Sequence, residues 1–342
     1  KIIIENKLES AFLNDDKFYL KILNLRSINN ERLKNYSNAI KLIKKRNLFI
    51  INSNEVDYLK ENISNTIFNY KKIYNKKNFD TAFNKHINLK KDYKDPVFLI
   101  GFPRSGTTLL DTILRSHSKT IVLEEKPYIS NAKDIFFKKN NNNLESILNI
   151  TPKEIIEIRS NYFNQIETIN KHKDKIIIDK LPLTMPELGF IKMIFPESKI
   201  ILALRHPCDV VVSCFFTSFK QNKAMANFLD WNETLDFYNN IFTLFEFYEN
   251  QIPLNCFKIK YEKIVNNFKN EIMKLLKFLD LKFENNILLF YKTAQKRDKI
   301  STPSYTQVIN PLYKSSIGRW ENYKEFLNFD DRVMGWVNKF NY

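Results

Sequence analysis

The sequence has very little glycine, and its glycines are unevenly placed. Only five occur among 342 residues, and none precedes Gly101. The residues before it carry Leu, Ile, Phe and Tyr at helical spacing among Lys and Asn, a pattern typical of amphipathic helices. We therefore predict an all-helical N-terminal region over residues 1–93.

Cysteine and histidine are scarce as well. Cys208, Cys214 and Cys256 form no CxxC pair and no metal-like cluster with the four histidines. This spacing argues against a disulfide framework and against a zinc site. We predict that no metal ion is bound, and that a reducing, cytoplasmic compartment is the default location.

Long apolar runs are missing too. No uninterrupted run reaches the roughly 18 to 20 residues that span a bilayer, so we predict no membrane span. The first residues do not have the pattern of a signal peptide. The chain begins with Lys1 rather than Met, and we expect residues upstream of it, which leaves targeting weakly constrained.

The chain does have a large apolar fraction and an excess of positive charge. A hydrophobic content of 44% with 29 Phe excludes a disordered chain. Fifty-four Lys and Arg against 38 Asp and Glu give a net charge of +16, which suggests an anionic ligand, substrate or surface. Biased composition is an equal alternative, because the basic residues are spread along the chain. We predict no nucleic-acid partner.

From Asp95 the sequence pattern changes to short runs of β-branched residues, each followed by a helical pattern. The runs are VFLIG from Val97, KIIID from Lys175, KIILALR from Lys199 and CFKIKYE from Cys256. This alternation predicts an α/β domain over residues 95–342, with a P-loop-like parallel sheet flanked by helices. Ligands of such sheets bind beyond the carboxyl ends of the strands.

The run PRSGTT, residues 103–108, lies where the first strand meets a helical pattern. Gly106 permits close approach of a ligand, and Thr107 and Thr108 bring hydroxyl and N–H groups to a helix N-terminus, which binds anions. Arg104 adds a guanidinium group, a cation that can donate two parallel hydrogen bonds to an anion. A nucleotide-triphosphate loop of the form G-x-x-x-x-G-K-[ST] would carry lysine at position 107. Without it, the loop suits a smaller anionic group, although a turn that binds nothing is an alternative.

A second candidate anion site lies in LRHPCDVVVS. Arg205 stands at the predicted end of a strand, and Ser213 follows eight residues later on the next helix. An arginine at a strand end is often only an ion-pair partner. Combined with the first loop, however, this pair becomes a candidate for holding a second anion.

PRSGTT after a strand, followed by an R-x7-S strand-and-helix unit, resembles the sulfotransferases that use 3′-phosphoadenosine 5′-phosphosulfate (PAPS). The resemblance points to the tyrosylprotein sulfotransferase branch and to bacterial sulfotransferases with tetratricopeptide repeats ahead of the catalytic domain. It covers about Asp95 to Tyr323. The segment Glu31 to Asn47 resembles the second half of a helical hairpin repeat with Tyr36, Ala39 and Ile40 on one face, while an ordinary helical cap is the alternative that we favour.

This resemblance implies roles for the two motifs. The residues that bind the 5′-phosphosulfate would be Arg104, Ser105, Gly106, Thr107 and Thr108. Arg205 and Ser213 would bind the 3′-phosphate. Tyr261 in KYEKIV matches a tyrosine that contacts the nucleotide, with a core tyrosine as the alternative. The missing loop lysine is then explained, because a sulfuryl donor has no γ-phosphate and the family requires no magnesium.

Transfer of a sulfuryl group to a hydroxyl needs a base for the acceptor. The spacing from Arg104 to Glu125 in IVLEEK matches that between the loop arginine and the catalytic glutamate of the tyrosylprotein branch. Glu125 is the expected base, with Glu124 as support. One alternative is a surface pair neutralised by Lys126. Another is His117 as the base, since cytosolic sulfotransferases use a histidine, but it lies at a helix end, where histidines cap carbonyls.

The reaction also needs positive charge at the departing phosphate oxygen. Lys180, after Asp179 in IIIDKLPLTMPE, matches the family lysine that stabilises the bridging oxygen. Taken alone, IIID resembles the magnesium-binding strand end of a kinase, so an ATP- and Mg-dependent small-molecule kinase with an atypical P-loop is the alternative function. A pure interaction protein is a third possibility, against which the complete set of motif residues argues.

The resemblance is weaker near the C-terminus. QVINPLYKSSIGRW, Gln307 to Trp320, resembles the family's segment that closes over the donor. A serine two residues before the tryptophan is replaced by Gly318, with Ser315 and Ser316 as candidate substitutes. Arg319 is either a helper or a surface charge.

The acceptor stays open at this stage. A protein tyrosine, a sugar hydroxyl and a small alcohol or phenol all fit, because acceptor pockets lie on variable loops. The excess of positive charge favours an acidic acceptor. The oligomeric state is equally open, with a homodimer as one alternative.

Overall fold

The computed structural model describes residues 15–53, 63–83, 89, 93–166, 174–295, 309, 312 and 316–342. The chain groups into two compact units. The first unit comprises residues 1–62, 206–239 and 315–342, and the second comprises residues 63–205 and 240–314. This division into units does not correspond to the predicted boundary between a helical region and a catalytic domain at residues 93–95, and that boundary stays a prediction.

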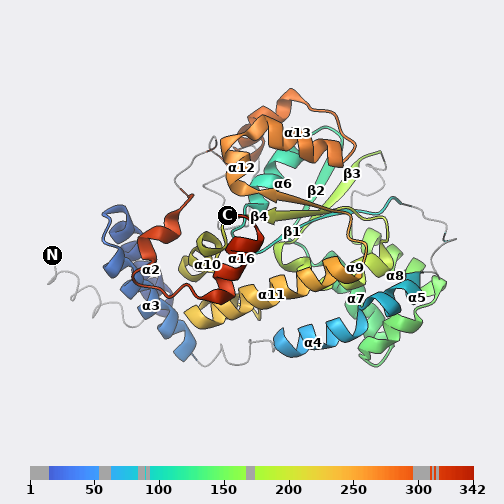
Figure 1. The fold of residues 1–342 in the computed structure, drawn as a ribbon, viewed down its shortest axis with the longest axis horizontal. Helices are drawn as coiled ribbons and strands as arrows, with labels where there is room; N and C mark the ends of the chain where they lie inside the picture. Colours follow the sequence, from blue (N-terminus) through green and yellow to red (C-terminus); the bar gives the residue numbers. More distant parts are fainter. Residues whose placement is uncertain are drawn as a thin grey trace. The chain divides into compact units, whose positions relative to one another are not determined.

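The elements of the second unit alternate between strands and helices (Figure 1). In chain order they are α4 Ile63–Ile73, α5 Lys76–Phe83, β1 Val97–Gly101, α6 Thr107–Arg115, β2 Thr120–Glu124, α7 Tyr128–Lys139, η2 Leu144–Asn149, α8 Pro152–Asn164, β3 Ile176–Lys180, η4 Pro182–Glu187, α9 Leu188–Ile194, β4 Ile200–Leu204, β5 Cys256–Lys260, α12 Tyr261–Asn266, α13 Phe268–Phe278, η6 Asn285–Leu289 and α14 Phe290–Gln295.

The elements of the first unit are all helical. They are α2 Asp16–Arg32, α3 Tyr36–Asn52, α10 Pro207–Phe216, η5 Met225–Phe228, η7 Arg319–Tyr323 and α16 Asp331–Lys339. The division between the units falls within α11, Trp231–Gln251. No helix among the described residues is long and apolar enough to cross a membrane.

A five-stranded parallel sheet forms the centre of the second unit. Its strand order is β2-β3-β1-β4-β5, so β1 lies between β3 and β4. The register places Leu99 opposite Lys180 on one side and opposite Ile201 on the other. The four predicted strand runs and the short run at IVLEEK all form strands, so the predicted α/β class with a helical N-terminal region is confirmed.

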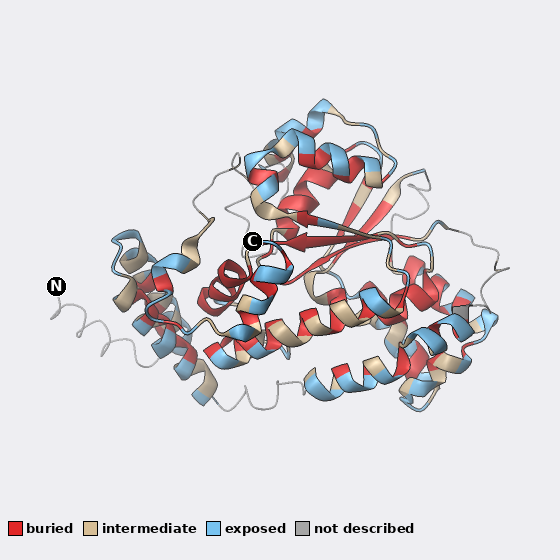
Figure 2. Cartoon of the chain, in the orientation of Figure 1, coloured by how far each residue is buried: buried red, intermediate tan, exposed pale blue. Residues whose placement is uncertain are grey.

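The two faces of the sheet pack against different helices because side chains alternate along a strand. Leu99 and Ile178 join a buried cluster with residues of α6, α13 and α14. Phe98, on the opposite face, lies against the rings of Tyr162 on α8 and Phe195 after α9. The strands are therefore mostly buried, as Figure 2 shows.

In the first unit, α2 and α3 form a helical hairpin. Asp15 caps α2 by accepting the N–H of Phe18 at 3.1 Å, and Asn35 caps α3 by accepting that of Asn38 at 3.3 Å. The segment Glu31–Asn47 thus contains the end of α2, the turn and most of α3, rather than one helix. Whether this hairpin belongs to a tetratricopeptide array stays a prediction.

Candidate functional site

Every strand of the sheet ends beside a residue that the sequence singled out. β1 leads into the loop 103–108, β2 ends at Glu124 just before Glu125, β3 ends at Lys180, β4 is followed by Arg205, and β5 is followed by Tyr261. Because the strands are parallel, their carboxyl ends meet along one edge of the sheet. The chain order changes direction between β1 and β4, which places the loop and Arg205 at the switch point.

The loop after β1 depends on two residues with left-handed backbone conformation. Arg104 has φ 69° and Gly106 has φ 99°. A Cβ atom on Gly106 would lie 3.1 Å from the ring of Tyr261. Glycine is therefore required at position 106, because a larger residue would be strained and would push against that ring.

The loop presents hydrogen-bond donors at the start of α6. Thr107 and Thr108 are buried in the first turn, and the N-cap residue Gly106 has no side chain that could cap the helix. The hydroxyl of Ser105 is buried and forms no hydrogen bond with any residue in the described ranges. A phosphate or sulfate group, which only accepts hydrogen bonds, fits such a donor set.

Arg205 is held against the loop by two contacts. Its Nη1 donates to the carbonyl oxygen of Arg104 at 3.2 Å, and its guanidinium lies 5.4 Å from the ring centroid of Tyr261. Tyr261 is only partly buried. The tyrosine packs between Gly106 and a cation and also contacts the apolar cluster on the α6 face of the sheet, so contact with the nucleotide and a core role both stay predictions.

Glu125 and Lys180 form an ion pair at the same edge. The Nζ of Lys180 lies 2.7 Å from Oε1 of Glu125, and the two residues are further joined by the N–H of Glu125 donating to the Lys180 carbonyl at 2.8 Å. The Lys180 side chain is completely buried, whereas that of Glu125 is 29% exposed. Lys126 instead lies over the ring of Tyr128, so a surface pair with Lys126 does not describe Glu125.

Asp111 on α6 was missed by sequence reasoning. Its side chain is completely buried, with Oδ2 3.5 Å from Nζ of Lys180 and Oδ1 2.9 Å from Nε of Arg115. A signal was available, since Asp111 is the one acidic residue in the buried run Thr107–Leu114. Charged side chains are rarely buried unless they are paired.

His117 lies at the other edge of the sheet, between the end of α6 and the start of β2. Its Nδ1 accepts the N–H of Lys119 at 3.0 Å, which leaves Nε2 as the donor to the carbonyl oxygen of Lys282 at 2.9 Å. Both ring nitrogens thus bind backbone groups. This placement matches the capping alternative and gives no support to His117 as a base.

Asp179 faces away from α6. Its carboxylate accepts the Tyr162 hydroxyl of α8 at 3.0 Å, and burial raises the pKa of Asp179 to about 7 although that hydrogen bond lowers it. A magnesium ligand at a strand end is an ionised carboxylate directed at the phosphate loop. Asp179 is instead directed at Tyr162 on α8, so the resemblance of IIID to a kinase strand end finds no support here.

Ser213 and the predicted residues from Ser315 to Arg319 belong to the first unit. Ser213 is buried on α10. Ser315 lies outside the described residues, as does half of the segment Gln307–Trp320. Gly318 has φ 73° and donates its N–H to the buried carboxylate of Asp209 at 2.8 Å, so a backbone constraint explains glycine in place of serine.

Arg319 makes a structural ion pair in the same unit. Its Nε and Nη2 lie 2.5 and 2.8 Å from the two carboxylate oxygens of Glu31, and its guanidinium lies 4.8 Å from the ring centroid of Phe216. Only 23% of the Arg319 side chain is exposed. Arg319 is therefore a partly buried, ion-paired cation rather than an isolated surface charge.

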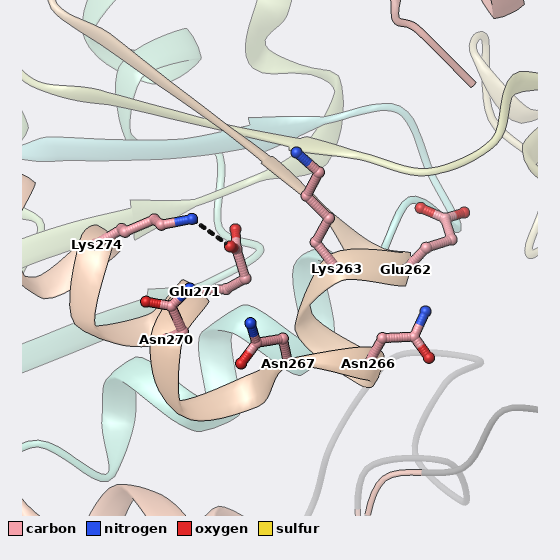
Figure 3. A pocket seen from close by; sticks show the side chains of 7 residues that line it. All are labelled: Glu262, Lys263, Asn266, Asn267, Asn270, Glu271 and Lys274. Carbon is pink, nitrogen blue, oxygen red and sulfur yellow. Dashed lines mark hydrogen bonds and ion pairs between the residues drawn. The ribbon is translucent and has the colours of Figure 1, made fainter.

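A separate hollow lies on α12 and α13 (Figure 3). An ion pair of 2.6 Å joins Lys274 and Glu271 of α13 at this hollow. Its lining consists of Glu262, Lys263, Asn266, Asn267, Asn270, Glu271 and Lys274. None of the predicted site residues lines it, although Glu262 directly follows Tyr261.

Together, the parallel sheet, the donor-rich loop and the cations along one edge define an α/β protein that binds an anionic group at the carboxyl ends of its strands. The comparisons with known proteins narrow this class. The model of the sulfotransferase family matches residues 96–285, more than half of the chain, and the protein therefore belongs to the sulfotransferase family.

Individual relatives agree with this membership. The chain is 28% identical over 242 residues to an uncharacterized protein of Aquifex aeolicus (strain VF5), which covers 68% of this chain and 31% of that protein. It is 25% identical over 236 residues to protein-tyrosine sulfotransferase A of Caenorhabditis elegans, which covers 66% and 60%. The match thus spans less than two thirds of either relative.

A solved structure shares the fold. The sulfotransferase domain of the olefin synthase from Synechococcus PCC 7002 superposes with a TM-score of 0.52 at 18% identity, covering 75% of this chain and 98% of that domain. At this level of identity the likeness concerns the fold alone.

Proposed function

We propose that this protein transfers a sulfuryl group from PAPS to an acceptor hydroxyl, without a metal ion. The observation that carries the proposal is the Lys180–Glu125 ion pair of 2.7 Å at the carboxyl edge of the sheet. The strand that bears Lys180 is hydrogen-bonded to β1, whose carboxyl end leads into the donor-rich loop. An acid–base pair beside an anion site is what sulfuryl transfer requires.

The proposed reaction is an in-line displacement. Glu125 takes the proton of the acceptor hydroxyl while that oxygen bonds to sulfur and the bond from sulfur to the bridging phosphate oxygen breaks. Lys180 and Arg104 stabilise the negative charge that stays on the departing phosphate, together with the donors of Ser105, Gly106, Thr107 and Thr108. The products are a sulfate ester and adenosine 3′,5′-bisphosphate, with one proton on Glu125.

Arg205 is proposed to bind the 3′-phosphate, and the family resemblance adds Ser213 to this role. Support comes from the contacts of Arg205 with the Arg104 carbonyl and the Tyr261 ring, which hold its guanidinium beside the loop. Tyr261 is proposed to contact the nucleotide. The buried, donor-only guanidinium suits an anion better than a neutral group.

The acceptor is proposed to be a hydroxyl compound. The names of several relatives specify protein tyrosine, and the net charge of +16 favours an acidic acceptor. Sugar hydroxyls and small phenols remain alternatives, to be separated by assaying each class with PAPS. Cytoplasmic location and a homodimer stay predictions.

The experiment that tests the donor is calorimetric titration of the protein with adenosine 3′,5′-bisphosphate and, separately, with ATP plus Mg²⁺. We expect binding of the bisphosphate in the absence of metal. Binding only of ATP with Mg²⁺ would instead make the protein a phosphotransferase, the alternative function.

The role of Glu125 is tested by the Glu125→Gln variant. The amide cannot accept a proton, so we expect at least a 100-fold loss of sulfuryl transfer, in the range of general-base catalysis. The affinity for adenosine 3′,5′-bisphosphate should change little, since Glu125 is not proposed to touch the nucleotide. Loss of nucleotide binding in this variant would assign Glu125 a structural role.

A further inference from the structure

We infer that Asp111 is a positioning residue for Lys180, and that it keeps the Lys180 side chain an ammonium ion while Glu125 takes up the acceptor proton. The inference rests on the proposed function, which gives Lys180 and Glu125 their roles. It concerns a residue for which the sequence motifs suggested no function.

Strand alternation brings the two side chains together. Lys180 lies two residues after Ile178 on β3, so both face the cluster formed with α6. Asp111 projects from α6 toward the same region, and its Oδ2 lies 3.5 Å from Nζ of Lys180 with both side chains 0% exposed. The other carboxylate oxygen accepts from Arg115 at 2.9 Å, which orients the carboxylate between two cations.

A buried ammonium ion needs a negative partner. Burial penalises the charged form of a lysine that has no such partner. Glu125 is the nearer partner, at 2.7 Å, but it becomes neutral when it accepts the acceptor proton. Lys180 would then lose this partner just as negative charge develops on the oxygen that it stabilises. Asp111 takes no part in the proposed proton transfer and stays beside Lys180.

The charged groups around the pair come from the elements that pack on α6. Glu124 and Glu125 lie at the end of β2, Arg115 follows Asp111 on α6 itself, and Lys292 on α14 is exposed. Glu284, just before η6, pairs with the N–H and hydroxyl of Ser118 at the far end of α6. Among these carboxylates, Asp111 is the completely buried one that contacts Lys180.

The test is calorimetric titration with adenosine 3′,5′-bisphosphate at pH 8 in two buffers of different ionisation enthalpy, which reports the protons taken up on binding. The phosphates are fully ionised at this pH. In Glu125→Gln, which mimics the neutral glutamate, proton uptake should stay close to zero, because Asp111 still pairs with Lys180. Adding Asp111→Asn to this variant leaves Lys180 without a negative partner, so we expect an uptake approaching about one proton as the anion binds and roughly tenfold weaker binding than in Glu125→Gln alone.

Three further variants make the outcome specific. Asp134→Asn applies the same chemical change to an exposed residue of α7 and should leave proton uptake and affinity unchanged. Asp111→Glu keeps the charge and should restore an uptake near that of wild type. Lys180→Met removes the group that titrates, so adding Asp111→Asn to it should cause no further proton uptake.

The results separate this inference from the proposed function. Failure of wild type to bind the bisphosphate overturns the proposed function and the inference with it. Binding by wild type with no extra proton uptake when Asp111→Asn is added to Glu125→Gln overturns the inference alone. If Asp111→Asn does not fold, the double variant Asp111→Asn with Lys180→Met decides. If the double variant folds, Asp111 is needed to pair with Lys180, as inferred. If it does not fold, the essential partner of Asp111 is Arg115, and the inference is overturned.

Discussion

At the scale of the residue, neighbouring charged groups on β3 have opposite environments. Lys180 faces α6 and pairs with two carboxylates, whereas Asp179 faces α8 and contacts the Tyr162 hydroxyl. Burial raises the pKa of Asp179 to about 7. Because the two residues are adjacent on the strand, their side chains point to opposite faces of the sheet. Lys180 is therefore paired with carboxylates, whereas burial disfavours the charged form of Asp179.

This environment predicts how stability depends on pH. The folded carboxyl of Asp179 titrates above the roughly 3.9 of the unfolded chain, so between about pH 4 and pH 7 the folded state holds a proton that the unfolded state has lost. The contribution of Asp179 to stability therefore falls as pH rises through this window. Asparagine does not titrate, so this loss of stability should be absent in Asp179→Asn. The free energy of unfolding of the variant should therefore rise by up to about 4 kcal/mol relative to that of wild type between pH 4 and pH 8.

Urea unfolding at several pH values measures this difference. Asp134→Asn, at an exposed position of α7, is the matched control and should follow wild type. Parallel stability profiles for wild type and Asp179→Asn would contradict the assigned environment of Asp179.

At the scale of the element, the C-terminal end of α10 is capped by an arginine from α3. The carbonyl groups of the last turn have no partner within a helix. The Nη1 of Arg46 donates to the carbonyl of Phe216 at 3.0 Å, and its Nη2 donates to that of Phe215 at 3.2 Å. Asn47 also donates to the Phe215 carbonyl, at 3.4 Å. The helix that carries Ser213 thus ends against the N-terminal hairpin.

The variant Arg46→Ala should be strongly destabilised. Arg46 is 1% exposed, so its loss leaves two buried carbonyl groups and the Asn24 side chain without their charged donor. We expect the free energy of unfolding to fall by about 3 kcal/mol, measured by urea denaturation. Arg32→Ala, at an exposed position on α2, should change it by less than about 0.5 kcal/mol. Equal stabilities of the two variants would argue against the cap.

At the scale of the whole molecule, the N-terminal helices are part of a compact unit built from three separate stretches of chain. Ile50 and Ile51 pack against buried Ala226 and Leu229. The ring of Tyr36 contacts that of Tyr323 at a centroid distance of 5.5 Å. These contacts join the hairpin to residues more than 170 positions away, so the hairpin is not an independent appendage.

A chain that starts at Ile63 should therefore lose the fold of this unit. Removing α2 and α3 exposes the apolar surface that they cover and leaves Arg319 without Glu31. We expect a lower urea midpoint and new binding of a hydrophobic dye. A truncated chain with the midpoint of the full chain would show instead that the hairpin contributes little.

Much of the fold could be predicted from local pattern. The runs at Val97, Lys175, Lys199 and Cys256 combine β-branched residues with a following helical period, and all became strands of one parallel sheet. Residues at strand ends could be anticipated as neighbours, because parallel strands bring their carboxyl ends to one edge. Arg104, Glu125, Lys180, Arg205 and Tyr261 are all found there.

The partners of these residues could not be predicted in the same way. Asp111 reaches Lys180, and Arg46 reaches α10, across 69 and 169 or more positions of sequence. Sequence reasoning also left His117 as a rival base and Arg319 as a helper or surface charge. Their actual contacts, with a distant backbone carbonyl and with Glu31, depend on which elements pack together.

The sequence by itself determined the elements, the class of sheet and the anion-binding loop, because period, β-branching, glycine and hydroxyl residues act over a few positions of chain. Only the tertiary structure decided which charges are paired. The energy of a charged group depends on its burial and on partners within a few ångströms, and packing brings those partners from distant parts of the chain. For this sulfotransferase-family protein, packing therefore set the environments of Lys180, Asp179 and Arg46.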